Sequence, residues 1–252
     1  MNDYTPFAEI YDLFYADFDD DLAMYAGFAE RTGGPILEIG SGTGRVALAL
    51  AKEGQRVIGL ELSDEMRSIA QRKIDSAEAH DQVTMVTGDM RRFQIDEYFG
   101  LAIVPINTFL HNLTLEDQLA TLACIRRHLK PGGLLVMDCF NPDPAQAADD
   151  RRLIVQRSVI DRATGQTALL LLSRATDWGN QQQEITYLVD RPDTQGRLQR
   201  TVFPASFRFI FRNEMQVLLK LGGFDLKEVY GSYELDPFET GSDKMIVVAS
   251  PA

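Results

Sequence analysis

The sequence predicts an α/β protein built on a mostly parallel sheet, and three observations lead to this fold class. Short apolar runs alternate with amphipathic helical segments over residues 1–140, a pattern typical of β-α-β units. A glycine-rich turn, GSGTG at 40–44, joins an apolar run to a helical segment. The chain has 252 residues, 45% of them hydrophobic, which is enough to bury the core of one such domain.

Each element of the first half of the chain has a local signal. Residues 1–31 are expected to form one or two helices, which the break at 32–35 ends. Ser63 is the expected N-cap of a later helix, because Asp64 and Glu65 follow it in the first turn. Strands are predicted at 36–39, 55–60, 83–87, 101–106 and 134–138, and helices at 45–52, 64–77 and 116–129.

The pattern changes after residue 140. Residues 151–211 hold four β-rich runs separated by turn signals, which predicts an antiparallel β meander inserted into the α/β domain. A helix at 214–221 and strands at 224–231 and 244–249 follow. No stretch is long enough to be a linker between domains. We therefore interpret residues 1–252 as one domain.

Composition excludes several classes of partner. The formal charge of −12 disfavours nucleic acid, because an acidic chain repels phosphate backbones. Cys124 and Cys139 form no C-x-x-C pair and no histidine cluster accompanies them, so we expect no disulfide framework and no metal site. No window approaches 18 consecutive apolar residues, and the acidic N-terminus lacks the features of a signal peptide. We therefore expect a cytoplasmic protein without membrane contact.

The glycine-rich turn indicates a nucleoside site. In open α/β sheets, ligands bind at the carboxyl ends of the strands. Glu61 ends the second predicted strand, 19 residues after Gly42, where a carboxylate can accept hydrogen bonds from ribose hydroxyls. A dinucleotide site requires G-x-G-x-x-G, but Arg45 replaces the third glycine. Of the two classes of nucleoside-binding protein that fit this pattern, an NAD-dependent oxidoreductase is therefore the less favoured.

The spacing G-x-G-x-G and the segments that follow it resemble the class I S-adenosylmethionine-dependent methyltransferases. Five segments match the family's motifs in order: ILEIGSGTG, VIGLELSDEM, VTGDMRRF, VPINTFLHN and LKPGGLLVMDCFNP. The resemblance implies a Rossmann-like seven-stranded sheet with helices on both faces and an antiparallel last strand. The N-terminal FAEIYDLFY is similar to the lid helix of the small-molecule branch, and with the β-rich insertion it most resembles glycine- and amino-sugar-type N-methyltransferases.

The resemblance implies a set of residues that bind S-adenosylmethionine. Glu38 would orient its ammonium group, Glu61 would bind the ribose, and Asp89 would accept a hydrogen bond from the adenine amino group. The other expected cofactor contacts are Gly40, Ser41, Gly42, Gly44, Leu62, Met66, Met90 and Ile106. Tyr11 and Tyr15 lie one helical turn apart, and this spacing fits either closure over the cofactor or core packing.

The methyl acceptor is expected beyond the fourth strand. Asn107, Phe109 and His111 are the candidates for binding it, and His111 is either a proton acceptor or a structural histidine. The aromatic residues of the meander would line the acceptor pocket or a homodimer contact, and Arg208 or Arg212 would anchor an acidic acceptor or form a surface ion pair. The expected reaction is methyl transfer to a small-molecule amine or hydroxyl. The alternative from another class is a catalytically silent regulatory protein that binds S-adenosylmethionine.

Overall fold

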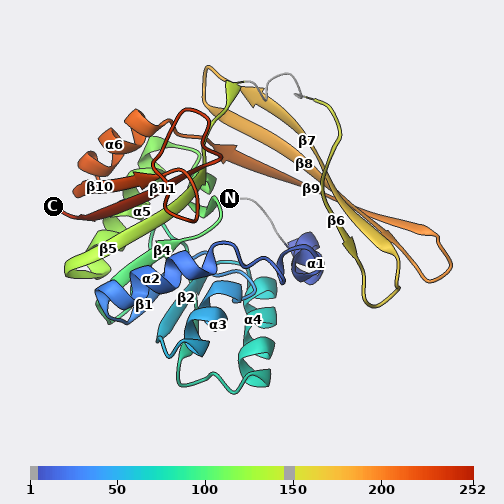
Figure 1. Cartoon of the computed structure of the whole chain (residues 1–252), viewed down its shortest axis with the longest axis horizontal. Coiled ribbons are helices and arrows are strands. Elements are labelled where there is room, and N and C mark those ends of the chain that lie inside the picture. Colours follow the sequence, from blue (N-terminus) through green and yellow to red (C-terminus); the bar gives the residue numbers. More distant parts are fainter. Residues whose placement is uncertain (1–4, 145–150) are drawn as a thin grey trace.

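The structure is a computed structural model that describes residues 5–144 and 151–252. Figure 1 shows an α/β unit built on one twisted sheet, with a second sheet projecting from it. The helices are α1 Thr5–Tyr15, α2 Leu22–Thr32, α3 Arg45–Lys52, α4 Asp64–Ser76, α5 Leu115–His128, α6 Arg212–Leu221 and the 3-10 helix η1 Thr108–His111. The strands of the large sheet are β1 Ile36–Ile39, β2 Val57–Glu61, β3 Val83–Thr87, β4 Phe99–Val104, β5 Leu129–Phe140, β10 Phe224–Tyr230 and β11 Lys244–Pro251.

The large sheet has seven strands in the order β10-β11-β5-β4-β1-β2-β3. Strands β3, β2, β1, β4 and β5 are parallel, while β11 pairs antiparallel with both β5 and β10. The predicted mostly parallel sheet with an antiparallel last strand is thus confirmed. The chain moves from β1 to β2 on one side and later to β4 on the other, so the order reverses beside β1, where α/β sheets bind ligands.

Helices cover both faces of this sheet because its strands alternate their apolar side chains between two cores. Leu37 and Ile39 of β1 join the core cluster that includes α5 and α6. Ile36 of the same strand joins the cluster that includes α2, α3 and α4. The central strands β1 and β4 are buried along their whole length, as expected for parallel strands covered on both faces.

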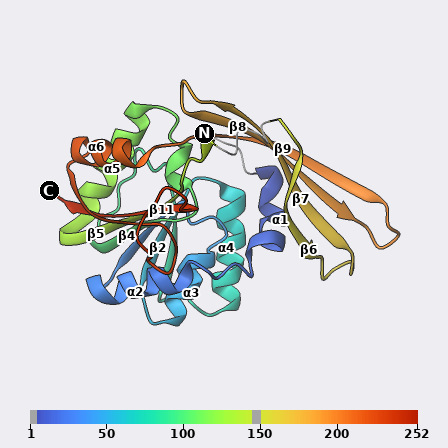
Figure 2. The same cartoon turned by 45° about the horizontal axis from the view of Figure 1, so that its top comes forward.

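The second sheet is a four-stranded antiparallel meander in the order β6-β7-β8-β9. Its strands are β6 Ile154–Ile160, β7 Thr167–Asp177, β8 Gln182–Pro192 and β9 Leu198–Arg208, inside the predicted range of 151–211. Helix α1 packs on it through Phe7 and Phe14, which share a core cluster with Leu170, Val189 and Phe203. Figures 1 and 2 agree that α1 lies between this sheet and α4.

Several boundaries differ from the sequence prediction by one to five residues, and the differences at the fourth and fifth strands have a clear physical reason. The fourth strand ends at Val104 rather than at residue 106, because Ile106 and Asn107 adopt positive φ angles of 43° and 61° and turn the chain into η1. The fifth strand begins at Leu129, directly after α5, because Leu129 is already extended and pairs with Phe99. The expected helix end at Leu129 and strand start at residue 134 are therefore wrong by a few residues.

Candidate active site

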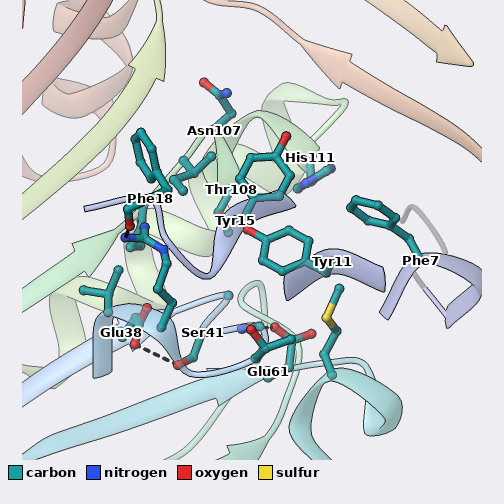
Figure 3. Close-up of a pocket in the computed structure, with 18 of the residues that line it drawn as sticks. Phe7, Tyr11, Tyr15, Phe18, Glu38, Ser41, Glu61, Asn107, Thr108 and His111 are labelled. Atoms are coloured by element: carbon teal, nitrogen blue, oxygen red, sulfur yellow. Dashed lines mark hydrogen bonds between the residues drawn. The ribbon is translucent and has the colours of Figure 1, made fainter. Parts of the chain in front are cut away.

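A cavity of about 1000 Å³ lies at the carboxyl ends of β1, β2 and β4. The glycine loop and the start of α4 form its floor, α1 and η1 form its sides, and the four-stranded sheet and the β10–β11 loop close the rest. Figure 3 shows Tyr11 and Tyr15 between Glu61 on one side and His111 and Asn107 on the other. The cavity is thus a single space shared by the glycine loop and the segment after the fourth strand.

Most of the residues expected in the site line this cavity. They are Tyr11, Tyr15, Glu38, Gly40, Ser41, Gly42, Glu61, Leu62, Met66, Met90, Ile106, Asn107 and His111. Gly44, Asp89 and Phe109 are not among its lining residues. Each of these three residues is adjacent in the sequence to a residue that does line the cavity.

Each of these three residues has a structural partner. Gly44 has a φ of +79° at the start of α3, and a Cβ there would lie 3.2 Å from the Ala70 side chain. The Asp89 carboxylate lies 2.6 Å from Nη2 of Arg91, and this guanidinium lowers the pKa of the carboxyl. Phe109 is fully buried in the core cluster beneath η1, so its ring faces the core and not a ligand.

Glu61 ties the glycine loop to the end of β2. One carboxylate oxygen accepts a hydrogen bond from the Gly42 N–H at 2.8 Å, and the other accepts one from the Ser63 N–H at 2.8 Å. Each oxygen keeps a second lone pair for a ligand hydroxyl. Burial raises the pKa of Glu61, although the two N–H groups favour the charged form.

Glu38 lies deeper, at the end of β1. It is 2% exposed and accepts a hydrogen bond from the Ser41 hydroxyl at 2.7 Å (Figure 3). Burial raises its pKa to about 7, and Arg45 opposes this shift. Arg45 is held in turn by Asp21, which accepts hydrogen bonds from both of its Nη atoms at 2.7 and 2.6 Å. A buried carboxyl that titrates near neutral pH is a feature of functional sites.

Helix α1 is fastened over the glycine loop by Asp12. One Asp12 oxygen accepts a hydrogen bond from the Thr43 hydroxyl at 2.6 Å, and the other lies 2.6 Å from Nζ of Lys73 on α4. The neighbouring rings of Tyr11 and Tyr15 stack at 4.7 Å on the cavity side. Sequence reasoning missed Asp12, because its partners lie far along the chain in α3's loop and in α4.

The far end of the cavity is formed by η1 and the four-stranded sheet. The His111 ring packs against the Phe207 ring with centroids 4.7 Å apart. Burial lowers the pKa of His111 to about 4, so the imidazole is neutral at neutral pH. Asn107 is fixed by its backbone N–H, which donates to the Asp138 carbonyl, and by its side-chain oxygen, which accepts from the Phe140 N–H.

A buried acid beneath Asn107 was also missed by sequence reasoning. Asp138, at the end of β5, is fully buried and accepts a hydrogen bond from the Tyr233 hydroxyl at 2.6 Å. Nζ of Lys244 lies 3.4 Å from its other oxygen. Tyr233 and Lys244 line the cavity, so this cluster fixes the β10–β11 loop as its wall. Asp138 stands in a predicted strand, but nothing nearby in the sequence marks these partners.

The expected anchors for an acidic acceptor lie elsewhere. Neither Arg208 nor Arg212 lines the cavity. Arg208 lies 3.3 Å from the Glu214 carboxylate, and Arg212 donates to the side chain of Asn213. Over residues 5–144 and 151–252, no group of three or more metal-ligating side chains comes together, and no helix is long and apolar enough to cross a membrane.

Comparisons with known proteins agree with this geometry. A family described as a methyltransferase domain matches residues 36–133. The cypemycin N-terminal methyltransferase of a Streptomyces species is 28% identical over 95% of this chain and 94% of that protein. A dTDP-3-amino-3,4,6-trideoxy-α-D-glucopyranose N,N-dimethyltransferase of Streptomyces venezuelae is 30% identical, over 52% of this chain and 56% of that protein.

A solved structure extends the likeness to the whole fold. The CcbJ methyltransferase from Streptomyces caelestis superposes with a TM-score of 0.80 at 25% identity, covering 92% of this chain and 90% of that chain. The likeness therefore includes the inserted sheet as well as the domain that carries the glycine loop. The sheet order, the turn after β1 and these relatives together support a class I S-adenosylmethionine-dependent methyltransferase.

Proposed function

We propose that this protein transfers the methyl group of S-adenosylmethionine to a small-molecule amine bound between η1 and the four-stranded sheet. The observation that carries the proposal is the single cavity, in which the glycine loop and Glu61 face the segment Asn107–His111. Its volume of about 1000 Å³ lies at the top of the range for ligand pockets, which leaves room for a small acceptor beside a cofactor.

The residues of the inner half fit S-adenosylmethionine. Glu38 would bind its ammonium group, and Glu61 would accept hydrogen bonds from its ribose hydroxyls. Glu38 is buried and Glu61 half-buried, and both have raised pKa values, so a cationic ligand would relieve the desolvation of their charged forms. A Cβ built on Gly42 meets no atom within 4 Å, which leaves the space over the loop for a ligand. Leu62, Met66 and Met90 would pack against the adenine.

The outer half is suited to an amine. When bound, the cofactor supplies a methyl group that its sulfonium already activates. Asn107 and His111 would hold the amine in its neutral form, because only an amine with a free lone pair can accept this methyl group. Neutral His111 would accept a hydrogen bond from the amine N–H, while Tyr11 and Tyr15 would exclude water from the space between the reactants. The names of the cypemycin and amino-sugar relatives describe nitrogen methylation, which supports nitrogen as the acceptor.

The first test is a thermal shift with S-adenosylmethionine, S-adenosylhomocysteine and NAD in parallel. We expect a rise of a few degrees with each adenosyl compound and none with NAD, because a ligand at 100 times its Kd stabilises the fold by about 2.7 kcal/mol. A rise of the melting temperature with NAD alone would contradict the proposal. Mass spectrometry of an amine panel then measures transfer. Binding of S-adenosylmethionine without transfer to any amine or hydroxyl would favour a silent regulatory protein.

We also propose that the chain forms a homodimer through its four-stranded sheet. Its outer face carries one apolar row across all four strands, since register pairs Val155 with Leu171, Leu171 with Leu188 and Leu188 with Val202. Val155 and Val202 are 57% and 53% exposed. A second copy would cover this row and the open edges of β6 and β9. The expected cytoplasmic location stays a prediction, which fractionation of source cells would check.

A further inference from the structure

The cavity contains one cation that no carboxylate neutralises within the described residues. Its cationic lining side chains in that part of the chain are Arg45, Arg157 and Lys244. Arg45 makes a bidentate pair with Asp21, and Lys244 lies 3.4 Å from Asp138. Across residues 5–144 and 151–252, Arg157 makes no ion pair with a carboxylate. A partly buried cation without a counter-ion favours binding of an anion.

Aromatic rings hold the Arg157 guanidinium in place. Its Cζ lies 4.6 Å from the ring centroid of Tyr15 and 5.1 Å from that of Phe18. Nη1 donates to the Phe14 carbonyl at 3.3 Å, and the side chain also hydrogen-bonds Tyr15. A guanidinium packed on rings keeps its remaining N–H donors in its own plane, in the fork that matches a carboxylate. The orientation of Arg157 is therefore set before any ligand binds.

Arg157 belongs to the wall that faces the acceptor. It stands on β6 of the four-stranded sheet, whose Tyr187 and Phe207 also line the cavity. The glycine loop with Glu38 and Glu61 belongs to the large sheet and lines the same cavity. An acceptor that enters the cavity along this wall therefore meets a cation.

We propose that Arg157 binds a carboxylate of the methyl acceptor, so that the acceptor is a small amine that also carries an acidic group. This inference rests on the proposed amine methylation and adds the chemical class of the substrate. It replaces Arg208 and Arg212, the sequence-based candidates for this role, which lie outside the cavity. The competing ligand is the carboxylate of the cofactor's own methionine group.

The first experiment measures binding by calorimetry and needs no turnover. Amines offered both as carboxylic acids and as their carboxamides, for example glycine and glycinamide within a wider panel, are titrated into the protein saturated with S-adenosylhomocysteine. We expect the carboxylate form of at least one pair to bind about 10- to 100-fold more tightly, and Arg157→Gln to abolish this preference. Arg157→Lys should retain only part of it, because an ammonium lacks the bidentate fork.

The control variant is Arg162→Gln. Arg162 is 90% exposed and lies 3.4 Å from Asp17 in the α1–α2 connection, so it also joins this sheet to the N-terminal segment but does not line the cavity. We expect Arg162→Gln to keep the carboxylate preference. If both variants lost acceptor binding equally, or if Arg157→Gln weakened acids and amides alike, Arg157 would be a structural clamp and the inference would be wrong.

Cofactor titrations separate the two sources of carboxylate. If Arg157 holds the cofactor's carboxylate, Arg157→Gln should weaken S-adenosylhomocysteine at least tenfold while leaving 5′-methylthioadenosine, which lacks the amino-acid group, unchanged. That result would overturn the inference. If Arg157 binds the acceptor instead, we expect Arg157→Gln to change the affinity for S-adenosylhomocysteine and for 5′-methylthioadenosine by less than about threefold.

Turnover on the same panel then separates this inference from the proposed function. Transfer to amines without regard to a carboxylate would support the function and contradict the inference. Preferential binding of acids without any transfer would support the inference and contradict the function. A panel in which no acid binds more tightly than its amide would contradict the inference whatever the turnover.

Discussion

Glu38 and Glu61 lie near the ends of the neighbouring strands β1 and β2, and burial raises the pKa of both carboxyl groups. Glu38 is the more sensitive of the two, because burial raises its pKa to about 7 while its strongest favourable contact is the neutral Ser41 hydroxyl. Its protonation should therefore be coupled to the binding of a cationic cofactor.

We expect affinity for S-adenosylhomocysteine to rise roughly tenfold from pH 6 to pH 7.5. The ligand's ammonium stabilises ionised Glu38, so binding lowers the pKa of this carboxyl and releases a proton, and affinity grows as pH rises through the free value. Calorimetry in buffers of different ionisation enthalpy measures the proton release. Glu38→Gln should flatten most of the pH dependence, and an unchanged slope in this variant would show that another group titrates.

Gly40 is required by both backbone conformation and space. Its φ is +69°, and an added Cβ would collide with the Thr108 side chain of η1. We expect Gly40→Ala to lower the free energy of unfolding by about 1–3 kcal/mol in urea titration. Gly27→Ala is the matched control, because Gly27 lies within α2 with nothing within 4 Å of an added Cβ. It should raise stability by about 0.5–1 kcal/mol.

The site residues that could be predicted from the sequence are those whose role depends only on their immediate neighbours in the chain. Gly40, Gly42 and Glu61 act through backbone turns and strand ends, which a short stretch of sequence specifies. Asp12 and Arg157 could not be assigned, because each depends on partners brought close only by the tertiary fold. For Phe109, the local position was misleading. Its place after the fourth strand suggested a contact with a ligand, but its ring packs in the core.

At the scale of elements, α1 is held from two sides. Asp12 joins it to Thr43 and Lys73, and Phe7 stacks on Phe203 of the four-stranded sheet at 4.5 Å. The expectation that Tyr11 and Tyr15 close over the cofactor depends on this attachment. Two polar contacts to the glycine loop and α4 fix the helix while its aromatic residues face the cavity.

We expect Asp12→Asn to weaken binding of S-adenosylhomocysteine by about 3- to 10-fold, mainly through faster dissociation, and to speed amide exchange in α1. The reason is loss of the Lys73 ion pair and weakening of the Thr43 hydrogen bond. Glu9→Gln serves as the control, since Glu9 is exposed on the same helix. Equal effects of both variants would mean that helix charge, and not this contact, matters.

At the scale of the molecule, the outer face of the four-stranded sheet is the surface proposed to pair two copies. We expect light scattering after size exclusion to give twice the chain mass, and Val202→Lys to give the monomer mass without lowering the melting temperature. Val217→Lys, on exposed α6, should leave the dimer intact. A monomeric native protein at micromolar concentration would contradict the proposal.

Fold class was predictable because periodicity and turn signals repeat over many residues. The alternation up to residue 140 specified five parallel strands, and the turn-separated runs at 151–211 specified a meander. Relative placement was not predictable, because the contacts that fasten the meander to the α/β domain are side-chain pairs such as His111 with Phe207. For the same reason, the sequence indicated the outer wall of the cavity only as the range 151–211 and not by its individual lining residues.

The cavity wall has a consequence for the order in which the protein is made. Its lining begins at Phe7 and ends at Lys244, and β11, which starts at Lys244, must insert between β5 and β10. The meander strands are joined by short turns and can pair as soon as they leave the ribosome. One edge of β5 pairs with β4, but its other edge waits for β11, more than a hundred residues later. A nascent chain can therefore form its four-stranded sheet before Lys244 and β11 complete the wall of the cavity.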